Sequence, residues 1–257
     1  MSTVPLLGVA FDDMSLSDAA RWIASRPEGA LFGYVVTPNA DHLVRLARAP
    51  ALRSAYEAAL LRLFDSRAVA LSARALGLPK PAVVTGSELA AELLRNHLRP
   101  GERITIVGLK AAFVPALMAR CNLAPPAHYE PPVGFEQDPA ELAKASAFVA
   151  AHPARFIFLA VGSPRQEIIA VRIAAEGRAT GTALCIGAGL EFLAGARRRA
   201  PRWMQQAGLE WSYRLASEPR RLARRYLVDC PAVLPMLVRE RLALQASAAA
   251  TMSASRS

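Results

Sequence analysis

The stretch RFIFLAVGSPRQE, residues 155–167, decides the fold class of this 257-residue chain. The apolar run 155–161 predicts a β-strand. It leads directly into the small and polar residues 162–167, which are typical of a turn at the start of a helix. A strand that runs through a short loop into a helix is the unit from which α/β proteins are built.

The same order recurs along the chain. Further apolar runs predict strands at 6–10, 31–36, 61–64, 103–107 and 182–186. Helices are expected between them, starting after cap residues at Ser15, Asn39 and Ser87. This alternation predicts an α/β fold with a Rossmann-like, mostly parallel sheet that carries helices on both faces.

The strand pattern stops near residue 196, which divides the chain into three parts. Residues 1–195 are expected to form the Rossmann-like core, and 196–245 a basic helical C-terminal appendage. Pro219 suits the first position of a helix, so the appendage should hold at least two helices. The Ala/Ser-rich residues 246–257 are expected to be disordered.

Arginine is concentrated at the start of the appendage. Residues 195–226 hold nine arginines, two tryptophans (Trp203 and Trp211) and only two acids, Glu210 and Glu218. Guanidinium groups bind phosphate in a bidentate manner, and tryptophan favours the membrane–water interface. The segment therefore favours a polyanionic partner, a lipid headgroup or a diphosphate, over a merely solvated helical face.

Composition and motifs bound the remaining possibilities. Three cysteines without a CxxC pattern fit a reducing compartment. We expect neither a signal peptide, because the N-terminus lacks a basic region, nor a membrane span, because no run of about 18 apolar residues occurs. The net charge of +10 leaves nucleic acid, anionic lipid and phosphorylated substrates open as partners.

Ligands of open α/β sheets bind beyond the carboxyl ends of the strands. Five expected strand-to-helix junctions carry small or polar residues there: 37–39, 65–67, 85–87, 162–167 and 187–189. Backbone N–H groups at such helix starts can hold phosphate. Each junction alone is ordinary turn chemistry, and the chain has neither GxGxxG nor GxxxxGK[ST].

Asp65 is a lone carboxylate at the end of an apolar run, a position that suits a general base. An equally simple role is the N-cap of a helix over 66–76. The chain has no Asp-X-Asp, and its four histidines show no metal-ligand spacing, so no metal site is expected. Arginines and helix N-termini would then stabilise a leaving diphosphate.

Several segments together resemble the WecG/TagA/CpsF family of bacterial glycosyltransferases. They are VVTPNADHLVRLAR (35–48), VTGSEL (84–89), VGSPRQE (161–167), GAGLEFLAG (187–195), RAP (199–201) and GLEWSYRLASEPRRLARRYL (208–227). The resemblance implies inverting transfer, without metal or cofactor, of a hexose or N-acetylhexosamine (or its uronic acid) from a UDP-sugar to a polyprenyl-diphosphate-linked sugar. It also implies peripheral attachment to the cytoplasmic face of the cell membrane, in the synthesis of exopolysaccharide, capsule, common antigen or teichoic acid.

The resemblance also implies roles for particular residues. Asp65 matches the proposed base, and Arg214, Arg221 and Arg224 match the residues expected to face the lipid diphosphate. The residues expected to bind the donor are Thr37, Asn39, Thr85, Gly86, Ser87, Gly162, Ser163, Gln166 and Glu191. The chain departs from the family pattern at Ser66 (commonly Gly), at Glu191 (commonly Asp) and at Val83 (often Arg).

Two other function classes lack their sequence signatures. A nucleic-acid-binding protein would need a helix-turn-helix, RRM or zinc-finger pattern, and a different sugar-nucleotide enzyme, such as an epimerase or oxidoreductase, would need the Gly-rich dinucleotide motif. The apolar stripe in 232–245 fits either packing on the core or contact with an anionic membrane surface. The donor sugar, the acceptor sugar and a homo-oligomeric state are left open.

Overall fold

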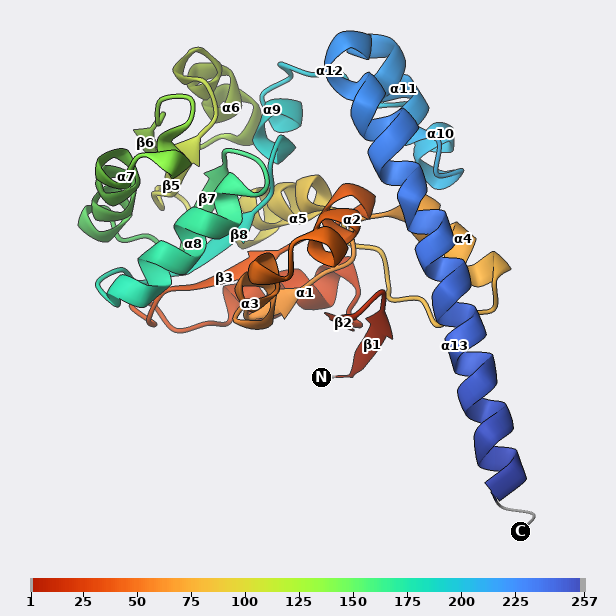
Figure 1. Cartoon of the computed structure of the whole chain (residues 1–257). Helices are drawn as coiled ribbons and strands as arrows, with labels where there is room; N and C mark the ends of the chain where they lie inside the picture. Colours follow the sequence, from red (N-terminus) through yellow and green to blue (C-terminus); the bar gives the residue numbers. More distant parts are fainter. Residues whose placement is uncertain (1, 255–257) are drawn as a thin grey trace.

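The computed structural model describes residues 2–254 and contains a six-stranded parallel sheet (Figure 1). The strand order is β4-β3-β8-β7-β5-β6. The strands are β3 Gly33–Val36, β4 Leu61–Arg62, β5 Thr105–Gly108, β6 Ala127–Tyr129, β7 Phe156–Ala160 and β8 Thr182–Cys185. The expected α/β class and parallel sheet are confirmed.

Helices cover both faces of the sheet, because successive strand residues point to opposite sides and are buried on each. In β7, Ile157 and Leu159 join one apolar cluster, while Phe156 and Phe158 join the other. The first cluster is covered by α2 Ala40–Arg48, α3 Arg53–Glu57, α4 Arg67–Ala75, α7 Pro139–Ala151, α8 Arg165–Glu176 and α13 Val233–Ala254. The second is covered by α1 Leu16–Ala24, α5 Gly86–Glu92, α6 Val114–Cys121 and α9 Gly189–Leu193.

Two sequence predictions about strands were wrong. Residues 6–10 are not one continuous strand: Leu6 ends β1 Thr3–Leu6, Val9 begins β2 Val9–Asp12, and Leu7 and Gly8 form the turn of this antiparallel hairpin. Leu7 and Gly8 both have positive φ, which ends one strand and starts the next. The edge strand β6 was missed, since three partly buried residues give no periodic signal.

The N-cap residues seen at the helix starts can be compared with those predicted from the sequence. Ser15 and Asn39 are N-caps, as predicted, and accept hydrogen bonds from the first turns of α1 and α2. For α5 the cap is Thr85, not Ser87, because the Thr85 hydroxyl accepts from the backbone N–H of Glu88. The helix therefore starts two residues earlier than predicted and brings its N-terminus to the end of β4.

The C-terminal residues form helices that pack on the sheet domain. They are α10 Arg202–Gln206, α11 Glu210–Ser217, α12 Pro219–Arg224 and the long α13, with a π-helical turn at Arg225–Asp229 and a 3-10 turn at Cys230–Ala232. Pro219 is the first residue of α12, as predicted. Helix α13 runs through 246–254, where we expected disorder, and 255–257 lie outside the described residues.

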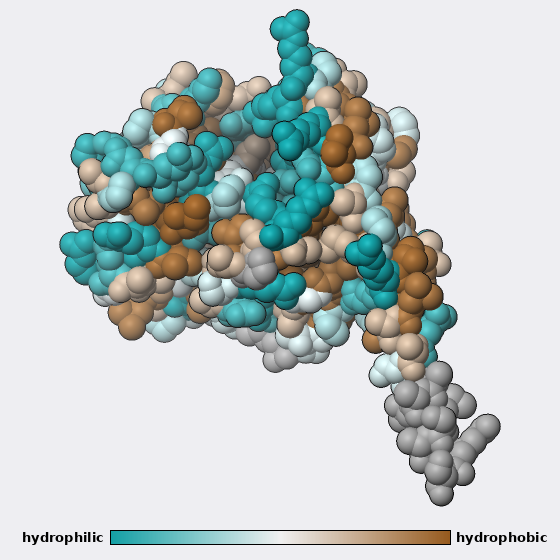
Figure 2. All heavy atoms as spheres, in the orientation of Figure 1, coloured by the Kyte–Doolittle hydropathy of each residue, from teal (hydrophilic) through white to brown (hydrophobic). Residues whose placement is uncertain are grey.

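One side of α13 packs on the core and the other faces solvent. Val233 and Leu237 belong to the same buried cluster as strand β3, and Glu240 accepts a hydrogen bond of 2.8 Å from the backbone N–H of Leu7. Leu234, Val238 and Leu242 are exposed, and Figure 2 shows hydrophobic residues over α13 beside strongly hydrophilic ones. Within the described residues no helix is both long and apolar enough to cross a membrane.

Candidate functional site

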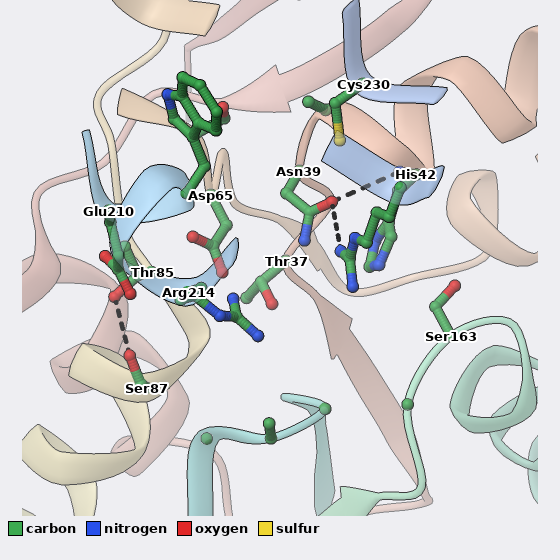
Figure 3. Close-up of a pocket in the computed structure, with 18 of the residues that line it drawn as sticks. Thr37, Asn39, His42, Asp65, Thr85, Ser87, Ser163, Glu210, Arg214 and Cys230 are labelled. Atoms are coloured by element: carbon green, nitrogen blue, oxygen red, sulfur yellow. Dashed lines mark hydrogen bonds between the residues drawn. The ribbon is translucent and has the colours of Figure 1, made fainter. Parts of the chain in front are cut away.

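A cavity of about 600 Å³ lies beyond the carboxyl ends of β3, β4, β7 and β8, and the C-terminal helices form its far wall (Figure 3). Parallel α/β sheets bind ligands at this edge. The structure brings eleven of the expected site residues to it: Thr37, Asn39, Asp65, Thr85, Ser87, Gly162, Ser163, Gln166, Glu191, Arg214 and Arg221. Gly86 and Arg224 are not part of the lining.

Asp65 lies at the pocket wall, and its carboxylate accepts a hydrogen bond of 3.1 Å from the backbone N–H of Gly86. It is not the N-cap of the following helix, because the Ser66 hydroxyl holds that place and accepts from Val69 N–H. Burial raises the pKa of Asp65 to about 7, although the Gly86 hydrogen bond opposes the shift. A carboxyl group that titrates near neutrality is suited to general base catalysis.

Gly86 acts through its backbone and its lack of a side chain. A Cβ at this position would lie 2.8 Å from Thr37 Oγ1, closer than van der Waals contact allows. Thr37 in turn donates a hydrogen bond of 3.2 Å to the backbone oxygen of Cys185 at the end of β8. The glycine thus lets the N-terminus of α5 approach β3, where its N–H group reaches Asp65.

Asn39 joins the pocket to the C-terminal helices. Its side-chain oxygen caps α2 by accepting from Asp41 and His42 N–H, and also accepts from Arg225 at 3.4 Å. The His42 side chain is buried and also lines the pocket. Burial first, and then the charges of Arg225 and Arg45, lower the pKa of His42 to about 3, so the ring is neutral at physiological pH.

Gln166 lines the pocket and holds one of its loops in place through a buried side-chain hydrogen bond. It is 2% exposed, and its side-chain oxygen accepts a hydrogen bond of 2.8 Å from the backbone N–H of Gly187. Its amide nitrogen donates to Glu167, whose carboxylate also accepts from the Tyr56 hydroxyl. Burial raises the pKa of Glu167. Sequence reasoning missed Tyr56 and Glu167, although Glu167 stands in the GSPRQE motif.

Glu191 is engaged by a cation of the same wall. Its carboxylate pairs with Arg197, and Arg197 also pairs with Glu218 at the end of α11. The ion pairs therefore connect α9 to the C-terminal helices. Because the Glu191 carboxylate already has a partner, a direct contact of Glu191 with a ligand would have to share or displace Arg197.

Two further arginines, Arg67 and Arg199, line the pocket beside Thr85. Both pair with Glu88, at 2.8 and 3.3 Å respectively. Burial disfavours the charge on Glu88, but hydrogen bonds from Arg67 and Thr85 outweigh it and lower its pKa. The sequence placed Arg199 in the arginine-rich segment 195–226 and in the RAP motif, but only the fold shows that it lies beside α5.

The three arginines expected at the lipid diphosphate are divided by the structure. Arg214 and Arg221 line the pocket, and Arg221 also pairs with Glu218 at 2.5 Å. Arg224 is exposed and lies outside the lining, whereas its neighbour Arg225 points to the pocket and pairs with Asp41 at 3.5 Å. A separate question is whether the site could hold a metal ion. Within residues 2–254, no three acidic, histidine or cysteine side chains lie close enough together to form a metal site.

Comparison with models of protein families identifies the family to which the chain belongs. Residues 4–247 match the model of the glycosyl transferase WecG/TagA/CpsF family. The chain belongs to this family. The resemblance seen in the motifs is thereby confirmed, and membership of this glycosyltransferase family implies a sugar-nucleotide donor and an acceptor.

Proposed function

We propose that this glycosyltransferase moves a hexose or N-acetylhexosamine (or its uronic acid) from a UDP-sugar to a polyprenyl-diphosphate-linked sugar, with inversion, in cell-surface polysaccharide synthesis. The observation that carries the proposal is the position of Asp65. Its carboxyl, with a pKa of about 7, lies between donor-side loops and the arginines of the C-terminal helices. A base between a donor and an acceptor is what a single displacement requires.

In this displacement the Asp65 carboxylate removes the proton of the acceptor hydroxyl. The hydroxyl oxygen then attacks the anomeric carbon on the side opposite to UDP, which inverts the configuration. The bond from the anomeric carbon to the β-phosphate oxygen breaks, and its electron pair leaves with UDP. Burial favours the neutral form of Asp65 that results.

Charge that develops on the leaving diphosphate would be stabilised by protein groups. The N-termini of α5 and α8, the loops at Gly162 and Gly187, and the pocket arginines all supply positive potential at the cavity. We therefore propose transfer without a metal ion. The expected result is activity that survives EDTA, and a rate that collapses on chelation and recovers with Mn²⁺ would contradict this.

The two parts of the chain then have separate tasks. Residues 1–195 bind the UDP-sugar, and 196–245 bind the lipid diphosphate at the inner face of the cell membrane. Arg214 and Arg221 at the pocket and the exposed apolar side of α13 support this division.

The proposal is tested by incubating the purified chain with a panel of UDP-sugars and a short-chain prenyl-diphosphate-linked sugar. Transfer with inverted anomeric configuration, measured by NMR of the product, is expected. Release of UDP without a transferred sugar, or retention of configuration, would overturn the proposed reaction. Asp65→Asn serves as the catalytically impaired control.

A further inference from the structure

Helix α11 presents two opposite charges to the pocket. Glu210 and Arg214 both line the cavity, and Figure 3 draws their side chains at the wall beside Asp65. Four residues of helix advance by about 6 Å, so the two side chains lie one above the other on the same face. A glutamate placed four residues before an arginine ordinarily forms an ion pair with it.

Neither side chain has such a partner. Within residues 2–254, no hydrogen bond or ion pair involves the carboxylate of Glu210, although Glu218 and Asp229 of the same region are both paired. Arg214 also forms no ion pair there, and it contacts the ring of Phe192 at 5.6 Å. In a chain with a net charge of +10, an unpaired carboxylate at a cavity wall is available to a ligand.

The base lies close to both charges. After burial and the Gly86 hydrogen bond, the negative charges of Glu210 and Glu88 raise the pKa of Asp65, and Arg214 opposes them. Because Asp65 and Glu210 line the same cavity, a sugar whose hydroxyl contacts Asp65 can present a second hydroxyl to Glu210. An ionised carboxylate is purely a hydrogen-bond acceptor, and the hydroxyls of a sugar are donors that match it.

We propose that Glu210 binds the acceptor-sugar hydroxyl adjacent to the one that Asp65 deprotonates, next to the acceptor diphosphate that the proposed function assigns to Arg214, one turn further along α11. This inference rests on the proposed function and narrows its acceptor to a sugar diphosphate with two adjacent free hydroxyls. Helix α11 is then the element that selects the acceptor sugar.

The test compares two acceptors, a short-chain prenyl-diphosphate-linked sugar and its deoxy analogue that lacks the adjacent hydroxyl. The wild-type chain should prefer the complete acceptor about 10- to 100-fold in kcat/KM, the usual loss for a hydrogen bond to a charged group. Glu210→Ala should lower kcat/KM for the complete acceptor by about as much and leave the analogue nearly unaffected. The preference should thus vanish.

Three controls separate this role from a structural one. Calorimetric affinity for UDP should be unchanged in Glu210→Ala, and Glu57→Ala, which removes an exposed carboxylate outside the pocket, should keep the wild-type preference. Glu210→Gln, which keeps the size of the side chain, should lose most of the preference, because a neutral amide oxygen is a weaker acceptor. Arg214→Ala should raise the acceptor KM and retain the preference.

The outcomes distinguish the inference from the function on which it rests. Wild-type transfer together with an intact preference in Glu210→Ala or Glu210→Gln would overturn the role of Glu210 alone. A wild-type chain that neither transfers sugar to these acceptors nor binds them in calorimetry would overturn both proposals.

Discussion

At the scale of the residue, Asp65 combines a reactive position with a local environment that suits proton transfer. Its hydrogen bond from Gly86 orients the carboxylate, and burial raises its pKa to about 7. Asp65→Asn keeps the hydrogen-bond acceptor but removes the base. We expect turnover to fall about 10²- to 10⁴-fold with UDP affinity nearly unchanged, measured by steady-state kinetics and calorimetry. Near-normal turnover would remove Asp65 from the mechanism.

The same residue predicts how activity and stability depend on pH. The base acts when deprotonated, so kcat/KM should rise as pH increases through about 7. Stability should change in the opposite sense. The folded-state pKa of about 7 lies above the ordinary carboxyl value of 3.8, so stability should fall as pH rises from about 4 to about 7 and level off above that.

Asp65→Asn separates these two effects. Asn cannot ionise, so the Tm of the variant should exceed that of the wild type by about 2 °C or more at pH 8.5. The difference should be small at about pH 3.5, where Asp65 is mostly protonated in both the folded and the unfolded state; calorimetry measures both. An activity limb near pH 4, or equal melting temperatures at both pH values, would show that the carboxyl titrates normally.

The residues of the site were predicted from the sequence to different degrees. Asp65 and Thr37 follow from their place after apolar runs, because strand ends in a parallel sheet meet at one edge. The structural contacts of Gln166 and Glu191 could not be foreseen, since they depend on Gly187 and Arg197 from other loops. Glu210 is marked only by its lack of a partner, which is a property of the fold.

At the scale of the element, long or strongly apolar segments were predictable and short ones were not. Strands β7 and β8 were found within one residue at each end, because they are continuous apolar runs. The hairpin at Leu7 was read as one strand, since a leucine at positive φ carries no turn signal. The start of α5 was misplaced because Thr85 and Ser87 are both good caps.

Replacing an arginine of α11 and an arginine of α12 should affect activity differently. Arg214 lines the pocket, whereas Arg224 is exposed outside it. Arg214→Ala should therefore reduce kcat/KM for the lipid-linked acceptor about 10- to 100-fold, the loss expected for one charge-assisted contact. Arg224→Ala is the matched control and should stay within about twofold. Equal losses in both variants would show that the C-terminal helices act through their charge as a whole.

Substitutions on the two sides of α13 should differ in their effect on the free energy of unfolding. Leu237 is fully buried in the core cluster, whereas Leu242, little more than one turn further, is 58% exposed. Leu237→Ala should lower the free energy of unfolding by about 2–5 kcal/mol through lost burial and a cavity. Leu242→Ala should leave it within about 0.5 kcal/mol. Urea titration of both variants checks this, and a stable Leu237→Ala would mean that α13 contributes little to the fold.

At the scale of the whole molecule, the sheet domain and the C-terminal helices share one interior. Leu222, Val233 and Leu237 are buried, and Arg48 and Asn39 of the sheet domain contact Asp229 and Arg225. The sequence change near residue 196 marks a change in chemistry, from strands to basic helices, and not a break in packing. Composition could not reveal this, because burial of a few leucines decides whether two segments fold as one.

The charge and the exposed apolar side of α13 together predict binding to anionic membranes. Leu234, Val238 and Leu242 recur every four residues on one side of the helix, and each is at least 44% exposed. Each nearby arginine adds about 1 kcal/mol at an anionic surface, and the leucines add apolar burial.

Sedimentation with vesicles should show binding that rises with anionic lipid and falls with salt. Replacing Leu234 and Val238 together by serine should weaken this binding about tenfold or more, whereas Val171→Ser, which changes a valine of similar exposure (40%) on α8, should not. Unchanged binding of the double variant would mean that the exposed side of α13 serves another contact.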